Sequence, residues 1–227
     1  MYDVKLPNID WLGQRGDLDR MFATDPSTEQ GLIMFYGASN FTRWSARWKH
    51  RPLEEDIRMK DGSRACVNHG FGTSTAEELL YYYPRLVKPW KPRAMVLSCG
   101  MGNSGSAGYT APEVMMLTAR VLDWARHDFP GIRLYLYLFH PNPSSNAEAR
   151  RKSGGLELNG MMERYCRRHE DVILADARTY PAFWQEGHMG DYDYPRPELY
   201  VEDGVHFNQA GYDVYRDYFL QLLDDIL

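Results

Sequence analysis

The chain has 227 residues and a formal net charge of −5, from 26 basic and 31 acidic side chains. This length suits one large α/β domain with a well-buried core, and no Ser-, Gly- or Pro-rich linker divides it. The acidic balance argues against nucleic acid as a partner, because nucleic-acid binders concentrate Lys and Arg on one face. The basic clusters at 150–152 and 167–168 lie in polar segments and are interpreted as solvated surface.

The cysteine pattern and the hydropathy exclude further classes of protein. The three cysteines are widely spaced, with neither the CxxC spacing of a zinc site nor the density of a disulfide scaffold. No basic and apolar leader opens the chain, and no apolar run approaches the ~20 residues of a membrane span. We therefore expect a cytoplasmic protein without membrane insertion, although secretion after removal of a signal segment would leave the same sequence.

The predicted elements alternate along the chain. Residues 1–30 form an N-terminal extension, expected on or near the sheet edge or against another subunit of a homo-oligomer. Beyond it, short runs rich in aliphatic and aromatic residues predict strands at 32–36, 64–68, 94–99, 132–139 and 172–176. Apolar spacing and end signals predict helices at 75–87, 112–128, 158–169 and 209–226. Strand–helix alternation is typical of a parallel sheet covered on both faces.

Ligands of such sheets bind beyond the carboxyl ends of the strands. Most of the small, polar and glycine-rich sequence falls just there, at 37–44, 69–74 and 100–109. After the fifth strand, residues 177–202 show no clear periodicity but contain six aromatic side chains. A loop of that length indicates a functional lid or pocket wall, with a packed irregular segment as the alternative.

Two separated motifs suggest nucleophilic catalysis. Asp203 lies three residues before His206, so one tight turn can hold the carboxylate and the imidazole on the same side. Far upstream, the first predicted strand ends at Gly37-Ala38-Ser39, which offers a hydroxyl. A serine hydroxyl becomes nucleophilic when a base accepts its proton, and a carboxylate can orient that base. Taken singly, each motif could also be an ordinary turn or a structural hydrogen-bonded pair.

Together these residues resemble the SGNH hydrolases, the GDSL-like esterase and lipase superfamily, from about Leu32 to the end of the chain. The matching segments are Tyr36-Gly37-Ala38-Ser39-Asn40, the run from Asn68 to Leu79, Gly102-Asn103, and Asp203 with His206. The resemblance implies a three-layer α/β/α sandwich with a central, about five-stranded parallel sheet (flavodoxin-like), formed by residues 31–227. It also implies a Ser39, Asp203 and His206 triad without metal or diffusible cofactor.

The resemblance assigns an oxyanion hole as well. Its donors would be the backbone N–H groups of Ser39 and Thr73 and the side-chain amide of Asn103. Three positions depart from the family pattern, namely Ala38, Thr73 and Ser104. A β-branched residue such as Thr73 adopts φ > 0 only with steric strain. Gly72 is therefore the alternative donor if this loop requires that conformation.

The expected activity is hydrolysis of a small ester, such as an O-acetylated carbohydrate, through an acyl-serine intermediate. The residues expected to contact substrate are Asn40, Trp44, His140 and Trp184. Trp44 could instead pack beneath the nucleophile loop. Transfer of the acyl group to an alcohol remains an alternative, because the same intermediate would serve both reactions.

Two rival classes remain to be weighed. Residues 100–105 match G-x-G-x-x-G after a strand, but the next predicted helix begins only near Pro112, which disfavours a dinucleotide site. The departures at Ala38, Thr73 and Ser104 would suit a catalytically weak sugar- or lipid-binding protein of the same fold. Against that class stands the presence of all the catalytic residue types.

Overall fold

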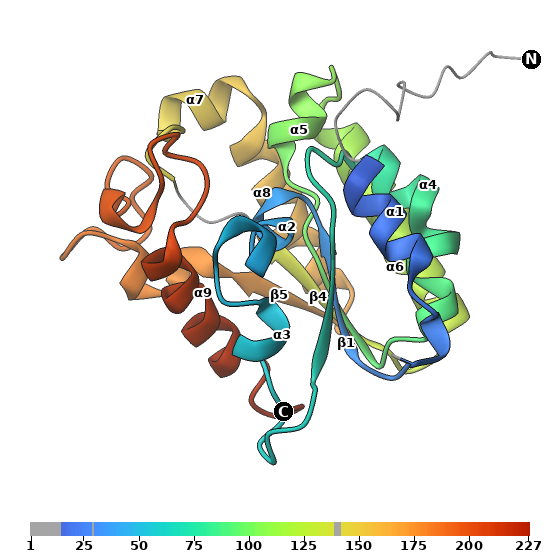
Figure 1. Ribbon diagram of the computed structural model, residues 1–227. Helices are drawn as coiled ribbons and strands as arrows, with labels where there is room; N and C mark the ends of the chain where they lie inside the picture. The colour runs from blue at the N-terminus through green and yellow to red at the C-terminus, as the bar shows by residue number, and fades with distance from the viewer. Residues whose placement is uncertain (1–14, 29, 139–141) are drawn as a thin grey trace, which may run out of the picture.

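Five parallel strands form the centre of the computed structural model, which describes residues 15–28, 30–138 and 142–227 (Figure 1). The strands lie in the order β2-β1-β3-β4-β5. Their bounds are β1 Ile33–Gly37, β2 Cys66–Gly70, β3 Ala94–Leu97, β4 Arg133–Leu138 and β5 Val172–Asp176. The predicted parallel sheet is confirmed, and the observed strand ends lie within two residues of the predicted ones. β1 therefore lies between β2 and β3, one strand in from the β2 edge of the sheet.

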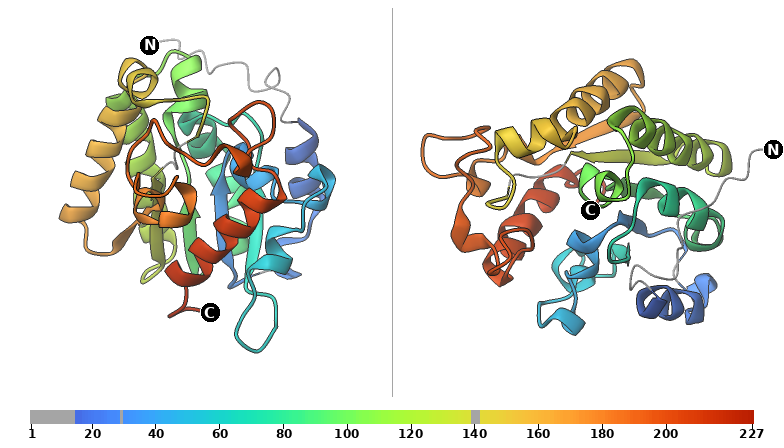
Figure 2. Two further views of the ribbon diagram at one scale, coloured as in Figure 1. Left: turned by 90° about the vertical axis from the view of Figure 1, so that its left-hand side faces the viewer. Right: turned by 90° about the horizontal axis from the view of Figure 1, so that it is seen from above.

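Helices cover both faces of this sheet, which gives the expected three layers (Figure 2). One face carries α4 (Ala76–Leu86), α6 (Ala111–Asp128) and α8 (Gly155–Arg168). The other carries α2 (Ser39–Thr42), α3 (Leu53–Asp56) and α9 (Gln209–Leu222). Two short helices, α5 (Met101–Ser106) and α7 (Ala147–Lys152), lie above the carboxyl ends of the strands (Figure 1).

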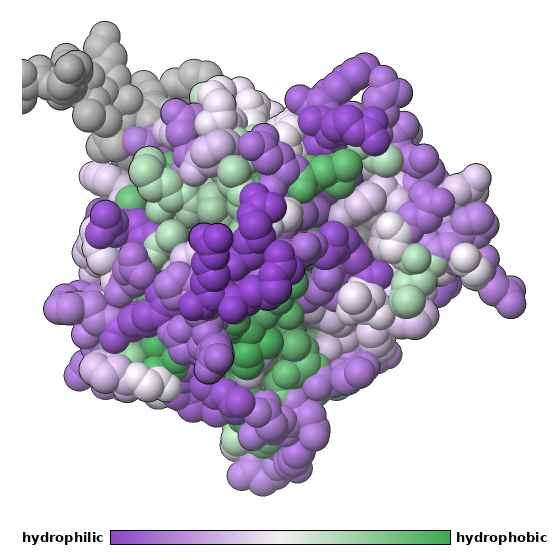
Figure 3. All heavy atoms as spheres, turned by 180° about the vertical axis from the view of Figure 1, so that it is seen from behind, coloured by the Kyte–Doolittle hydropathy of each residue, from purple (hydrophilic) through white to green (hydrophobic). Residues whose placement is uncertain are grey.

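The two hydrophobic cores follow from the period of the strands. In β1, Met34 and Tyr36 pack in the α4–α6–α8 layer, whereas Ile33 and Phe35 pack in the α2–α3–α9 layer. Alternate residues of a strand point to opposite faces, so a strand buried on both sides is apolar throughout. Seen from behind, the outer surface is largely hydrophilic, with separate apolar patches (Figure 3).

Local sequence signals explain where the long helices begin. Thr75 caps α4 and forms a reciprocal capping box with Glu78, and Thr110 does the same with Glu113 at α6. The Asn208 side chain accepts a hydrogen bond from the backbone N–H of Gly211 at 3.1 Å and caps α9. Such caps satisfy backbone N–H groups that the first turn of a helix leaves without partners.

The described part of the N-terminal extension contains helix α1 (Arg15–Ala23), which lies against α4 (Figure 1). The Phe22 ring lies 6.0 Å from that of Tyr82, and the Arg85 guanidinium covers Phe22 at 3.6 Å. Leu18 and Met21 of α1 are buried as well. Burial of these side chains fixes α1 on the sheet domain.

In the aromatic segment after β5, the side chains of Phe183, Trp184 and Tyr200 are buried, whereas Tyr194 is exposed. It forms three 3₁₀ turns, at Ala177–Thr179, Pro181–Phe183 and Pro197–Leu199. Phe183 stacks on Phe207 with ring centroids 5.8 Å apart. The buried rings contribute hydrophobic area to the α9 layer, as the packed irregular alternative expects for this part of the segment. Within the described ranges, none of the helices combines the length and apolar composition needed to cross a bilayer.

Candidate active site

Ser39 is the first residue of α2, directly beyond the interior strand β1. Two glycines let the backbone approach closely here. A Cβ on Gly37 would lie 2.8 Å from Ser98, and a Cβ on Gly70 would lie 2.5 Å from the backbone nitrogen of Thr42. Contacts below 3.0 Å would force the backbone to move, so Gly70 allows α2 to lie close to the end of β2, and Gly37 allows the segment after β3 to lie close to the end of β1.

Asp203 and His206 lie in one tight turn between Tyr200 and α9. One carboxylate oxygen of Asp203 accepts backbone N–H groups from Val205 at 2.8 Å and from His206 at 2.9 Å. The other oxygen lies 2.7 Å from Nδ1 of His206. Gly204, between them, has a φ of 63°, which glycine adopts without steric cost. The turn therefore presents the imidazole with its Nε2 atom directed away from Asp203.

That Nε2 atom lies 2.9 Å from Oγ of Ser39, although the two residues are 167 positions apart. Ser39, His206 and Asp203 thus form one continuous chain of hydrogen-bonding atoms. This arrangement is able to move a proton from a hydroxyl to an imidazole, with the carboxylate orienting the ring.

The electrostatics keep the imidazole neutral and the carboxylate charged. Burial lowers the pKa of His206 below its usual 6.5, opposed by the hydrogen bond that the ring donates to Asp203 and assisted by the positive charge of Arg43. Partial burial opposes ionisation of Asp203, but hydrogen bonds from His206 and Val205 outweigh it and lower its pKa to about 2. A neutral imidazole beside an ionised carboxylate is the state in which His206 accepts a proton.

Arg43 is a site residue that the sequence analysis missed. Its guanidinium lies 3.4 Å from the Asp203 carboxylate and 4.4 Å from the centre of the Trp48 ring. Four positions separate Arg43 from Ser39, a spacing that places two side chains on the same side of a helical turn. That spacing is the signal that would have found it.

The lowered pKa of His206 predicts the acidic limit of activity. Only the neutral imidazole accepts a proton, so kcat/KM should rise with pH and reach half its plateau below pH 6.5. Arg43→Met removes a positive charge, should raise the pKa of His206, and should move this midpoint to higher pH. Rates of ester hydrolysis between pH 4 and 8 would measure the shift. Arg58→Met, on an exposed residue, serves as the control; an unchanged midpoint in Arg43→Met would contradict the prediction.

The candidate oxyanion donors lie on two neighbouring loops. The backbone N–H of Gly72 donates to a carboxylate oxygen of Asp17 at 3.1 Å. Thr73 adopts a φ of 59°, so the loop takes the conformation that the sequence analysis considered unfavourable for this residue. The Asn103 side chain, on α5, donates to the backbone carbonyl of Ser74 at 3.0 Å. Asp17 was also missed, because its contact with Gly72 bridges 55 positions of sequence.

The conformation of Thr73 should be measurable as strain. The left-handed region costs a residue with a Cβ roughly 1–2 kcal/mol. We therefore expect Thr73→Gly to be more stable than Thr73→Ala by about 1 kcal/mol, because only glycine removes the Cβ. Urea unfolding of the two variants would test this, and equal midpoints would show that the loop relaxes without cost.

The structure corrects two of the expected substrate contacts. Trp44 has no exposed surface, and its Nε1 donates to Asp56 at 2.7 Å within the α2–α3–α9 layer. Trp184 is 3% exposed, and its Nε1 donates to the carbonyl of Arg178 at 2.9 Å. Both indoles pack in the core and offer no surface to a ligand. Asn40 is also buried, and His140 lies outside the described residues.

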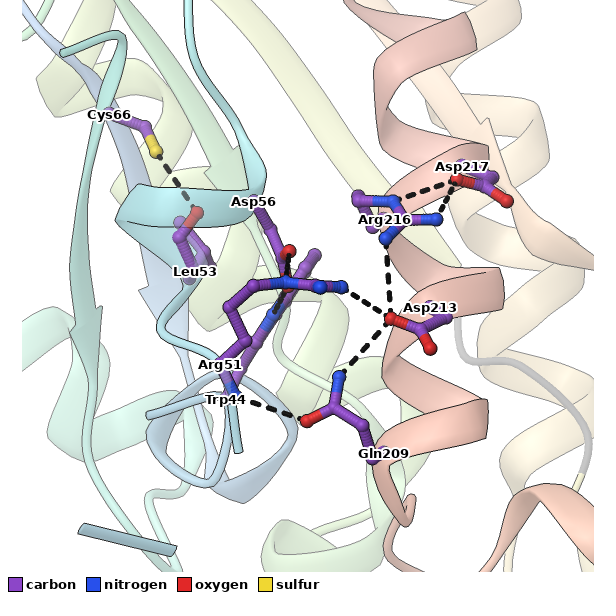
Figure 4. Close-up of polar contacts among 9 residues, drawn as sticks. All are labelled: Trp44, Arg51, Leu53, Asp56, Cys66, Gln209, Asp213, Arg216 and Asp217. Atoms are coloured by element: carbon purple, nitrogen blue, oxygen red, sulfur yellow. Dashed lines mark hydrogen bonds and ion pairs between the residues drawn. The ribbon is translucent and has the colours of Figure 1, made fainter. Parts of the chain in front are cut away.

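An ion network holds the nucleophile segment to the final helix. Figure 4 shows the Arg51 guanidinium between Asp56, at the end of α3, and Asp213 on α9. Gln209, also on α9, accepts from the backbone N–H of Arg51 at 3.0 Å and donates to Asp213 at 3.2 Å. Asp56 is buried and also binds Trp44. Because α9 begins three residues after His206, this network links the segment that follows Ser39 to the helix that follows His206.

The chain belongs to the GDSL-like lipase/acylhydrolase family, whose model matches residues 30–214. No curated protein matches its sequence significantly. Among solved structures, a GDSL-like lipase from Bacteroides thetaiotaomicron is similar, with 17% identity, a TM-score of 0.67 and coverage of 95% of this chain and 99% of the other. An acetyl xylan esterase is 17% identical, with a TM-score of 0.68 and coverage of 84% and 98%. A psychrotrophic esterase from Pseudoalteromonas sp. has 14% identity, a TM-score of 0.60 and coverage of 86% and 98%. At these identities the structural similarity establishes the fold.

Proposed function

We propose that this protein is a serine carboxylic-ester hydrolase in which Ser39 is the nucleophile, His206 the general base and Asp203 the group that orients it. The observation that carries the proposal is the 2.9 Å approach of His206 Nε2 to Ser39 Oγ, with Asp203 at 2.7 Å from the other ring nitrogen. Membership of an acylhydrolase family supports the same reaction class.

The proposed reaction has two displacements. Ser39 Oγ attacks the ester carbonyl carbon while its proton passes to Nε2 of His206. The tetrahedral intermediate collapses, and the alcohol leaves with the proton from His206. Water then attacks the acyl-serine, again giving a proton to His206. When this second intermediate collapses, Ser39 Oγ recovers that proton and the carboxylic acid is released.

Three donors are proposed to stabilise the negative charge on the carbonyl oxygen. They are the backbone N–H groups of Ser39 and Thr73 and the amide of Asn103. Gly72, the alternative donor, directs its N–H to Asp17. The Asn103 amide carries two hydrogens, so its bond to Ser74 leaves a second hydrogen for a substrate oxygen.

Removing the Asn103 amide should mainly affect the transition state. Asn103→Ala is expected to lower kcat by ~10²–10³, with a smaller change in KM, because the donor acts on charge that develops during reaction. Steady-state kinetics with p-nitrophenyl acetate would measure it. Asn146→Ala, at the N-cap of α7, provides a control for loss of an asparagine amide; a change confined to KM would argue against the oxyanion role.

The proposed substrate is a small ester, with an O-acetylated carbohydrate as the preferred example. Fold similarity to an acetyl xylan esterase supports that preference. A panel of p-nitrophenyl esters of increasing acyl length, run beside acetylated oligosaccharides, would measure the chain-length limit and the alcohol preference.

The mechanism is tested most directly with a fluorophosphonate probe, which labels activated serines. We expect labelling of the intact protein, loss in Ser39→Ala, and retention in Ser63→Ala, a control on an exposed serine. Absence of labelling in the intact folded protein would favour a non-catalytic binding protein of the same fold.

A further inference from the structure

A small cavity lies beside the candidate active site, between α5, α7, α8 and the turn that carries His206. Its volume is about 180 Å³. Gly100 and Gly102 border it next to Asn103, and Val205 borders it next to His206. One arm of an ester held at Ser39 would therefore meet the mouth of this cavity.

The described wall of the cavity combines apolar side chains, such as Leu158 and Met162, with several hydrogen-bonding groups, and it carries one full charge. Arg150, on α7, supplies that charge, and no described carboxylate lines the cavity. Asn142, Ser144 and Asn159 contribute neutral polar groups from the loop after β4 and from α8. The electrostatic character of the wall is thus positive.

Arg150 is held in place by its neighbours. It is 5% exposed, its Nε donates to the carbonyl of Ser145 at 3.0 Å, and its guanidinium lies 4.8 Å from the centre of the Tyr192 ring. Tyr192 is itself fixed by the Asn159 amide, at 2.9 Å from its hydroxyl. A fixed guanidinium loses little conformational entropy on binding and presents its N–H groups in the planar geometry that matches a carboxylate.

We propose that this cavity binds a carboxylate carried on a short arm of the ester substrate, with Arg150 as the group that recognises it. The inference rests on the proposed esterase function and adds the substrate class. The size of the cavity supports a short arm, because 180 Å³ is small beside the ~300–1,000 Å³ of typical ligand pockets. Burial strengthens a charged hydrogen bond, so a carboxylate should be distinguished sharply from a neutral group of the same shape.

The test compares pairs of esters of similar shape, in which one member carries a carboxylate and the other a neutral group. For the acyl arm, p-nitrophenyl hemisuccinate is compared with p-nitrophenyl 4-methylpentanoate. For the alcohol arm, 2-acetoxypropanoate is compared with 2-acetoxypropanamide. We expect the intact protein to prefer the anionic ester of one pair by ~10- to 100-fold in kcat/KM. Equal kcat/KM within both pairs would overturn the proposal.

Variants assign any preference to the cavity. Arg150→Met should reduce the anionic-to-neutral ratio by ~10- to 100-fold, and Arg150→Lys should restore part of it. Arg151→Met, on the exposed neighbouring residue, is the matched control and should keep the ratio. A preference that survives in folded Arg150→Met would place the recognition elsewhere and overturn the assignment.

Two further measurements separate the ways in which the proposal can fail. If Arg150→Met does not fold, the proposal is tested by inhibition of the intact protein with succinate. Competitive inhibition by succinate, without inhibition by acetamide, would support carboxylate binding in the cavity. No inhibition would overturn the proposal. Failure to hydrolyse any of the four esters, together with absence of phosphonate labelling, would reject the esterase function and this inference with it. Labelling and hydrolysis without charge preference would reject the inference alone.

Discussion

Replacing His206 by alanine is expected to reduce kcat for ester hydrolysis by ~10⁴–10⁶, the largest loss that a single substitution in this chain should cause. Without the imidazole, the proton of Ser39 has no acceptor at 2.9 Å, and the leaving alcohol has no donor. The N–H donors aimed at the carbonyl oxygen would remain, so activity above the uncatalysed rate should persist. Steady-state kinetics on a p-nitrophenyl ester would measure the residual kcat.

Non-additivity provides the sharper form of this prediction. When residues act as one unit, removing two of them lowers kcat little more than removing one. The double variant Ser39→Ala, His206→Ala should therefore have about the same kcat as either single variant. His127→Ala is the control, because its side chain is 87% exposed. A residual kcat above about one tenth in His206→Ala would show that another group accepts the proton.

The largest effect on stability is expected from Trp44→Ala. The indole is fully buried and stacks on Tyr212 with ring centroids 5.5 Å apart, so its removal leaves a large cavity in the α2–α3–α9 layer. The substitution also removes a donor from the buried Asp56 carboxylate. We expect the free energy of unfolding to fall by ~3–5 kcal/mol, a large share of the 5–15 kcal/mol typical of a domain. Urea titration followed by circular dichroism would measure it.

Matched substitutions separate packing from the hydrogen bond. Trp48→Ala, four residues along and 41% exposed, should change the free energy of unfolding by less than about 1 kcal/mol. Trp44→Phe keeps much of the ring but loses the N–H, so it should lie between Trp44→Ala and the unaltered protein. Equal unfolding midpoints for Trp44→Ala and Trp48→Ala would show that the core repacks around the missing indole.

The regular elements were predictable because their local signals are strong. Strands such as 172–176 are short apolar runs, and caps such as Thr75 mark helix starts, so the five strands and four long helices follow from sequence. The short helices were missed because one or two turns show no period. Helix α2, of four residues, and α5, of six, are formed by packing and loop geometry instead of propensity.

The site divides in the same way. The proximity of Ser39 and His206 could be predicted from the sequence, because parallel strands end at one edge of the sheet. The contacts of Arg43 and Asp17 could not, because they depend on distances that only the folded chain supplies. The buried indoles were misplaced because an aromatic residue near a site can serve the core or the pocket. Sequence period alone does not separate these roles where the segment is irregular, as around Trp184.

The 167-residue separation of Ser39 and His206 has a consequence for biosynthesis. While the polypeptide is still leaving the ribosome, its serine is an ordinary alcohol, since the imidazole has yet to be translated. On the proposed mechanism, Ser39 becomes nucleophilic only when the turn that carries His206 has folded against it. Turnover would then report folding of the domain through its final helix.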